Sequence, residues 1–451
     1  ADYGVNIGRA AAYSGAGHYD VPHCSIDSYV VYTNKVFGTA YRGFGHLEVL
    51  WGLERNMDIA ARRLGLDPLE FRLKNCLRPG SITITGERIG EHHGRVDKCL
   101  EAVARDIGWN GTKSDAERKR EWKTGKVRGK GLALLHKAPA MPTFTSTGVI
   151  LKFNENGTVD LSTSLVDYGQ GTYTTLAQIA AEELRIPVEK VNVPWDCDTA
   201  FTPYDWQTVA SKGAFMSGNA TIAAAQDCLR QLKETAAQVL RCPVEELECR
   251  DERVFVRHDP DKGIPYRDLA HGYVYPNGNA IGGPVIGRGR YTAQGLTHLD
   301  PETGQGLPAL DWTYGAHAVE IEVDVQTGDL EVLKLASAFD VGQVLNEALV
   351  KGQIVGGVVQ GLGSALTEEF RFSPEGRFLN PTLVDYKILT AKDIPREMTQ
   401  HTVETPDAAG PYGARGVAEH PMISVPSALG NALRDALGID YFRLPLSSER
   451  V

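Results

Sequence analysis

A carboxylate near the C-terminus is the strongest candidate for chemistry in this sequence. Residues 410–422 read Gly-Pro-Tyr-Gly-Ala-Arg-Gly-Val-Ala-Glu-His-Pro-Met, so Glu419 stands just before an apolar run with helical spacing. A carboxylate held in a cleft can act as a general base. The same position also suits an electrostatic contact with the positive end of a helix dipole. The local pattern leaves both interpretations open.

Three further loops with similar glycine spacing stand at comparable junctions upstream. They are residues 41–45 (Tyr-Arg-Gly-Phe-Gly), 168–171 (Tyr-Gly-Gln-Gly) and 360–363 (Gln-Gly-Leu-Gly). Glycine allows backbone N–H groups to approach a ligand closely, and helix N-termini favour anions. Each loop alone is equally compatible with an ordinary turn and cap. Together they predict one site assembled from distant parts of the chain.

Composition limits the class of protein. The 451 residues are 42% hydrophobic, enough to build two or three domains. A formal net charge of -10 and the absence of basic runs argue against nucleic-acid or anionic-membrane partners. No apolar stretch reaches the roughly 18 residues of a membrane span, and the N-terminus lacks a signal-peptide pattern. We therefore expect a cytoplasmic protein.

The seven cysteines are too widely spaced to hold a metal cluster. No C-x-x-C pair occurs, and the closest two cysteines are seven positions apart. Zinc ribbons and iron–sulfur clusters need closely grouped thiolates. We expect free thiols in a reducing compartment, most of them buried as small hydrophobic side chains.

In the first hundred residues the pattern predicts one strand and three helices. Residues 29–33 are typical of a strand, and apolar residues recur at helical spacing over 47–64. Asp67 and Pro68 predict the N-cap and first turn of a short helix. A glycine-rich stretch over 78–94 places a domain boundary near residue 93, and a helix over 96–107 follows.

The remainder alternates strand pairs with long helices. Two hairpins are predicted, with turns at 154–157 (Asn-Glu-Asn-Gly) and 326–329 (Gln-Thr-Gly-Asp). Helices are expected over 173–184, 219–240, 349–369 and 425–437, whereas 113–126 is a charged surface run and 251–312 a long surface excursion. Strand pairs interleaved with helices indicate an α+β architecture rather than a doubly wound sheet.

In order along the chain, five segments resemble those of one known family. They are residues 37–45, 167–172, 208–213 leading to 217–220, 359–363 and 413–419. This set is similar to the cofactor and substrate loops of the molybdenum-cofactor subunit of xanthine oxidase-type molybdenum hydroxylases. The resemblance covers essentially the whole chain. It implies layered mixed sheets and helices, with residues 1–93 as the C-terminal remnant of the first molybdenum-cofactor-binding domain and 94–451 as the second.

The resemblance also implies a cofactor and the residues that bind it. In this family the pterin dithiolene holds the molybdenum, so no metal ligand is expected from the side chains. The implied cofactor is molybdenum-molybdopterin, with its cytosine dinucleotide form as an alternative. Ser211 and Lys212 would offer donors to its phosphate, and Thr172 would cap the following helix. The implied cofactor-binding residues are Arg42, Tyr168, Gly169, Gln170, Gly171, Thr172, Val209, Ala210, Ser211, Lys212, Gly213 and Gln360.

The implied reaction is hydroxylation with oxygen derived from water. Glu419 would be the catalytic base, Arg42 would orient the substrate or stabilise its developing charge, and Phe44 would pack against a flat ring. The alternatives are a surface salt bridge for Arg42 and a core aromatic for Phe44. The expected substrate is an N-heteroaromatic compound of the purine or pyridine carboxylate type. Two other readings stay open: a structural half without catalysis, and an aldehyde-oxidising member of the family.

The chain departs from the family pattern at two positions next to the base. The usual Gly-Val-Gly-Glu-Pro-Pro is here Gly-Val-Ala-Glu-His-Pro, with Ala418 and His420 as the changed residues. His420 adds a second titratable group beside Glu419. The family's N-terminal portion, its iron–sulfur module and its flavin module are not in this sequence. We therefore expect a split subunit, as in nicotinate dehydrogenase, with the N-terminal half, a 2Fe-2S subunit and an FAD subunit as partners.

Overall fold

The computed structural model describes residues 3–36, 38–138 and 146–451, so position 37 of the arginine loop lies outside the described residues. The chain forms two compact units. The first unit comprises residues 1–139, 295–408 and 417–451, and the second comprises 140–294 and 409–416. The division predicted at residue 93 concerns the family domains and stays a prediction.

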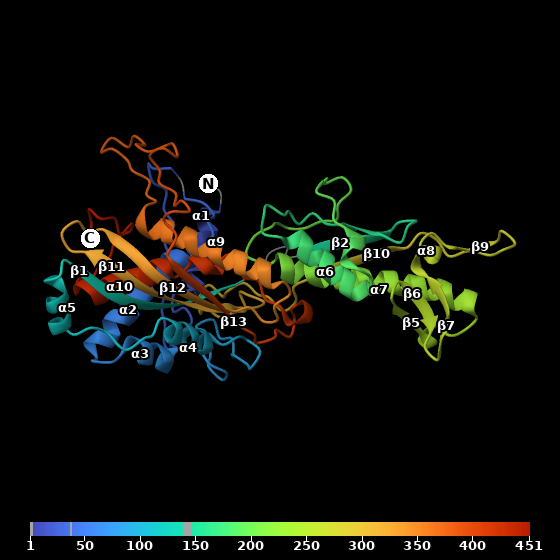
Figure 1. Cartoon of the computed structure of the whole chain (residues 1–451), viewed down its shortest axis with the longest axis horizontal. Coiled ribbons are helices and arrows are strands. Elements are labelled where there is room, and N and C mark those ends of the chain that lie inside the picture. Colours follow the sequence, from blue (N-terminus) through green and yellow to red (C-terminus); the bar gives the residue numbers. More distant parts are fainter. Residues whose placement is uncertain (1–2, 37, 139–145) are drawn as a thin grey trace. The chain divides into compact units, whose positions relative to one another are not determined.

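A four-stranded sheet forms the centre of the first unit. Its order is β1 (Lys126–Lys137), β11 (Thr313–Asp324), β12 (Leu330–Asp340) and β13 (Glu397–Val403), with only the last pair parallel. Helix α10 (Val425–Leu437) packs on β1, and α4 (Val96–Asp106) packs on β11 and β12 (Figure 1). Because side chains alternate along β1, Leu135 joins the core cluster of α10 whereas Leu134 joins that of α4.

Two glycines allow α10 to lie directly on β1. A Cβ at Gly131 would stand 2.1 Å from the carbonyl oxygen of Ala428, and one at Gly129 would stand 2.2 Å from that of Ala432. Only glycine permits so close an approach between strand and helix. This contact fixes the start of α10, which directly follows the Glu419 loop.

Local capping explains several helices of the first unit. Asp67 caps α3 (Pro68–Asn75) by accepting from the backbone N–H groups of Leu69 and Glu70, as predicted. Ser114 forms a capping box with Glu117 at α5 (Asp115–Trp122), so part of the charged run is an exposed helix. The other helices of this unit are α1 (Gly4–Tyr13), α2 (His46–Arg63), α9 (Glu347–Leu366) and η4 (His420–Met422).

A buried carboxylate connects four segments of the first unit. Glu54 of α2 accepts hydrogen bonds from His18 Nε2 (2.9 Å), the Tyr19 hydroxyl (2.6 Å), Arg72 Nε (2.9 Å) and the Leu134 N–H (3.1 Å). Burial alone would raise the pKa of Glu54, but the Arg72 charge and these hydrogen bonds hold it at about 2. The ionised Glu54 thereby fixes α2 against β1 and α3.

The second unit is a sheet covered by two helices. The sheet order is β10 (Ile286–Thr292), β2 (Ser146–Phe153), β3 (Val159–Ser162) and β4 (Val191–Asn192). Helix α7 (Gly213–Leu240) packs on β10 and β2, and α6 (Thr172–Leu184) packs on α7 (Figure 1). A smaller sheet also contacts α7, formed by β5 (Leu247–Arg250), β6 (Arg253–Val256) and β7 (Asp259–Pro265). The remaining elements are α8 (Tyr266–Leu269), β8 (Tyr273–Val274), β9 (Ala280–Ile281), η1 (Val188–Lys190), η2 (Val244–Glu246) and η3 (Pro411–Gly413).

Two predictions of secondary structure were wrong. Residues 29–33 are extended, but they form no strand in the structure, because no neighbouring strand pairs with them. Residues 251–312 are not only a surface excursion, since β6, β7 and β10 lie within them. The pattern did not predict β10 because this strand has glycine at alternate positions in place of apolar side chains. Each of these glycines stands where α7 approaches the backbone of the strand.

The α+β architecture and both predicted hairpins are confirmed. Within the described residues, no helix is both long and apolar enough to cross a membrane. All seven cysteines are unpaired, but only Cys76, Cys99 and Cys228 are buried. The expectation that most cysteines are buried was therefore wrong, because Cys24 and Cys197 lie in exposed segments and the other two are half-buried.

The close approach at β1 can be tested by substitution. Gly131→Ala should lower the free energy of unfolding by about 1–3 kcal/mol, because its methyl group would overlap the backbone of α10. The matched control is Gly352→Ala on the exposed side of α9, where no atom lies within 4 Å of the new Cβ. That variant should gain roughly 0.5–1 kcal/mol from helix propensity. Urea unfolding followed by circular dichroism measures both, and equal effects would contradict the packing described.

Candidate active site

The structure places Glu419 between a glycine loop and a buried lysine. Its Oε2 lies 3.3 Å from the N–H of Gly43 and 3.4 Å from Nζ of Lys137. The Glu419 side chain keeps 16% of its surface exposed, whereas Lys137 keeps none. One oxygen of the carboxylate is thus held by the protein while part of the group still faces outward.

Arg42 clamps the same loop. Its Nε donates to the carbonyl oxygen of Ala418, and its Nη1 donates to Gln360 Oε1 at 3.0 Å. Its Nη2 donates to both the backbone and side-chain oxygens of Gln353 at 3.1 Å. The structure therefore brings together the predicted residues Arg42, Gln360 and Glu419. Gln353 of α9 is a neighbour that the sequence did not single out.

The loop between Arg42 and α2 has an unusual backbone. Three consecutive residues have positive φ: Gly43 (99°), Phe44 (29°) and Gly45 (80°). A Cβ at Gly45 would stand 2.6 Å from the carbonyl oxygen of Ile7, so this position requires glycine. Backbone strain of this kind concentrates at functional sites.

Phe44 is partly buried against the first unit. It packs edge-on against Tyr3, with 6.2 Å between ring centroids, and it lines the core cluster of α4. These contacts match the core-aromatic alternative. The predicted stacking of Phe44 on a substrate ring stays a prediction.

Buried histidines surround Lys137. Burial lowers the pKa of His46, His136 and His420 well below the usual value, and the charge of Lys137 lowers all three further. These imidazoles are therefore neutral at neutral pH. His420 is fully buried, unlike Glu419, which keeps an exposed edge.

The predicted cofactor loop of the second unit is organised by Asp167. Its carboxylate accepts from the N–H groups of Gly169 (2.9 Å), Gly171 (3.3 Å) and Tyr173 (3.0 Å). Thr172 was predicted as the helix cap, and this was wrong. Gly171, with φ of 78°, occupies the N-cap position of α6. The Asp167 carboxylate, which lies before the helix, accepts from the Tyr173 N–H in the first turn.

The second predicted loop lies beside the first. The Val166 N–H donates to Thr208 Oγ1 at 2.8 Å, and the Tyr168 hydroxyl donates to the Thr208 carbonyl at 3.2 Å. Ala210 and Ser211 have φ of 54° and 56°, immediately before α7 begins at Gly213. The N-terminal ends of α6 and α7 are thereby brought together, and each contributes a positive helix-dipole end.

Lys212 points to an internal partner. Its Nζ lies 2.9 and 3.0 Å from the two carboxylate oxygens of Asp205, and both side chains are 1% exposed. Burial lowers the pKa of Lys212 despite this partner. The Lys212 charge is therefore balanced within the unit, and its predicted contact with an anion stays a prediction.

The first of these loops leaves open space at its backbone. A Cβ at Gly169, whose φ is 116°, would meet no atom within 4 Å, so a ligand can approach the backbone there. Helix N-termini favour anions, and the N–H groups of Gly169, Gly171 and Tyr173 at the start of α6 already donate to the Asp167 carboxylate. Tyr168 is 71% exposed beside them. Val209, Gln170 and Gly213 lie in the same pair of loops.

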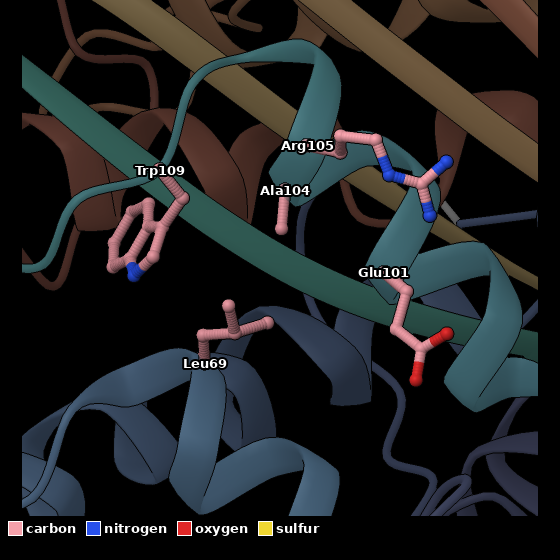
Figure 2. Close-up of a pocket in the computed structure, with 5 residues that line it drawn as sticks. All are labelled: Leu69, Glu101, Ala104, Arg105 and Trp109. Carbon is pink, nitrogen blue, oxygen red and sulfur yellow. The ribbon is translucent and has the colours of Figure 1, made fainter.

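Two other features of the described residues are separate from these loops. A surface hollow between α3 and α4 is lined by Leu69, Glu101, Ala104, Arg105 and Trp109, which include none of the predicted site residues (Figure 2). Within residues 3–36, 38–138 and 146–451, no group of three or more His, Cys, Asp or Glu side chains is arranged to hold a metal ion.

Sequence reasoning missed Lys137 and Asp167. Lys137 stands two positions after the apolar run at 132–135. A strand of buried residues that continues through this lysine would have indicated that its charge is buried. Asp167 stands two, four and six positions before the residues whose N–H groups it accepts, a spacing that suggests a side-chain cap.

The chain matches family models for the molybdopterin cofactor-binding domain over residues 102–395 and 1–76. It is 30% identical to an aldehyde oxidoreductase of Megalodesulfovibrio gigas, over 98% of this chain and 44% of that protein. It is 29% identical to the xanthine dehydrogenase molybdenum-binding subunit of Escherichia coli O157:H7, over 99% of this chain and 58% of that subunit.

A solved structure gives the same relationship. Quinoline 2-oxidoreductase from Pseudomonas putida 86 matches with a TM-score of 0.77 and 27% identity, covering 98% of this chain and 56% of that one. The chain therefore spans about half the length of the relatives it matches.

The buried histidines predict a dependence of stability on pH. Because their pKa values are lowered in the folded state, the unfolded state binds more protons below about pH 6.5. The free energy of unfolding should fall as the pH drops below that value, by about 1.4 kcal/mol per pH unit for each histidine.

Unfolding between pH 5 and 8 measures this slope. His46→Gln should reduce the slope by the contribution of one histidine. His23→Gln, in an exposed segment, should leave the slope unchanged. An identical slope in His46→Gln and the parent protein would contradict the assignment.

Proposed function

Because the chain belongs to the molybdenum-binding large subunits of the xanthine oxidase family, we propose that it is the C-terminal half of the catalytic subunit of a molybdenum hydroxylase. The substrate we propose is an N-heteroaromatic compound of the purine or pyridine carboxylate type. One observation carries the proposal: the Arg42 loop and the Glu419 loop form one hydrogen-bonded site, through Arg42 to Ala418 and Gly43 to Glu419, each pair 376 positions apart in the chain.

The proposed cofactor site includes the loops of the second unit. Residues 168–172 and 209–213 would hold the pterin and its phosphate tail, in the cytosine dinucleotide form or without the nucleotide. Gln360 stays a further proposed cofactor-binding residue. When bound, the molybdenum cofactor supplies the two-electron oxidation of the substrate and the transfer of oxygen derived from water.

The residues of this chain control the proton and the substrate. Glu419 would accept the proton released in the reaction, and the Gly43 N–H keeps one carboxylate oxygen in place. Arg42 holds the Glu419 loop through the carbonyl oxygen of Ala418, and it would also orient the substrate or stabilise its developing charge. The similarity to a xanthine dehydrogenase subunit and to quinoline 2-oxidoreductase supports a flat heterocyclic substrate.

We propose that the N-terminal half of the molybdenum subunit covers residues 29–32. Tyr29, Val30, Val31 and Tyr32 are 83%, 49%, 73% and 92% exposed in an extended segment that has strand composition. Exposed apolar segments of this kind mark interfaces. A 2Fe-2S subunit and an FAD subunit would then receive the electrons.

Replacing the proposed base tests this function. Glu419→Gln keeps the volume of the side chain but cannot accept the proton, so turnover should fall by on the order of 10²–10⁴ while molybdenum content stays unchanged. Glu48→Gln, an exposed position in the first turn of α2, is the matched control. A substrate panel of purines, pyridine carboxylates, quinolines and aldehydes measured on the complex from its native source gives the rates. Turnover of Glu419→Gln within tenfold of the parent enzyme would reject the assignment of Glu419 as the base. Activity on aldehydes alone would show that the substrate is an aldehyde and not a heterocycle.

The cofactor loop has its own test. Gly169→Ala should lower the molybdenum content of the purified complex, because its methyl group enters the open space over the loop and φ of 116° disfavours alanine. Gly278→Ala is the control, since it also has positive φ (82°) and open space but lies in the turn between β8 and β9. Metal analysis showing equal losses in both variants would attribute the effect to backbone strain rather than to binding.

A further inference from the structure

Lys137 is the last residue of β1 and has no exposed surface. It lies on the face of the strand that carries Ala133 and Leu135, both of which belong to the core cluster of α10. A buried ammonium group without a partner would cost several kcal/mol. Its Nζ contacts the Ala138 carbonyl at 3.2 Å and the Glu419 carboxylate at 3.4 Å.

The other titratable groups packed around Lys137 do not supply a negative charge. His46 is the first residue of α2, His136 is the neighbour on β1, and His420 begins η4. All three are fully buried with lowered pKa values, so they are neutral near pH 7. The carboxylate within ion-pair distance of Lys137 is that of Glu419.

We infer that Lys137 is a positioning residue for Glu419: its buried charge fixes one oxygen of the carboxylate, so that the exposed edge faces the reacting group. The inference rests on the proposed role of Glu419 as the base. Lys137 and the Gly43 N–H approach the same atom, Oε2, from β1 and from the arginine loop.

A Lys137→Met variant tests the inference, because methionine fills the space without a charge. In the complex, kcat should fall roughly 10²-fold, as for a comparable misplacement of a catalytic group, while KM and molybdenum content change little. The control is Lys334→Met on β12 of the same sheet, whose Nζ pairs with Asp106 at 2.7 Å. That variant should keep the parent kcat. If Lys137→Met fails to accumulate, Lys137→Gln serves for the same comparison.

A double variant separates positioning from general packing. In the Glu419→Gln background, Lys137→Met should cause no further loss, because Lys137 acts only through Glu419. Equal losses in both backgrounds, or a parental kcat in Lys137→Met, would overturn the inference. Full activity of Glu419→Gln would instead reject the proposed base itself, so the two failures are distinguishable.

Discussion

The ionised Glu54 carboxylate, buried at the centre of the first unit, is the contact on which the candidate site depends. It joins α2 to β1 through the Leu134 N–H and to α3 through Arg72. The arginine loop leads directly into α2, and Lys137 lies three residues beyond Leu134 on β1. Glu54 therefore fixes the two elements that hold Glu419 between them. Its pKa of about 2 shows that Arg72 and the hydrogen bonds outweigh the effect of burial.

Glycine has two different physical roles in this chain. At Gly131 and Gly289 it removes a side chain so that a helix can lie on the backbone of a strand, which positions α10 and α7. At Gly43, Gly45 and Gly169 it permits positive φ in the loops of the candidate site. The first role builds the scaffold, and the second shapes the candidate loops. A count of glycines in the sequence cannot separate the two roles.

The sequence predicted the elements whose signals are local. Asp67 before Pro68 gave the start of α3, and the periodicity over 47–64 gave α2. The sequence did not predict β10, because the glycines of this strand make room for α7, a helix that is distant in the chain. It missed the role of Asp167, because that residue caps α6 from outside the helix. The segment over 29–33 has the composition of a strand, but a strand forms only with a neighbour, and the described residues supply none.

We propose that Glu419 faces the molybdenum cofactor. Crystals of the complex purified from its native source, measured at the molybdenum absorption edge, would locate the metal without reference to activity. We predict a single anomalous peak beside the Glu419 carboxylate, on the side opposite Lys137. A peak remote from Glu419, or one surrounded by histidine, cysteine or carboxylate ligands of this chain, would contradict it.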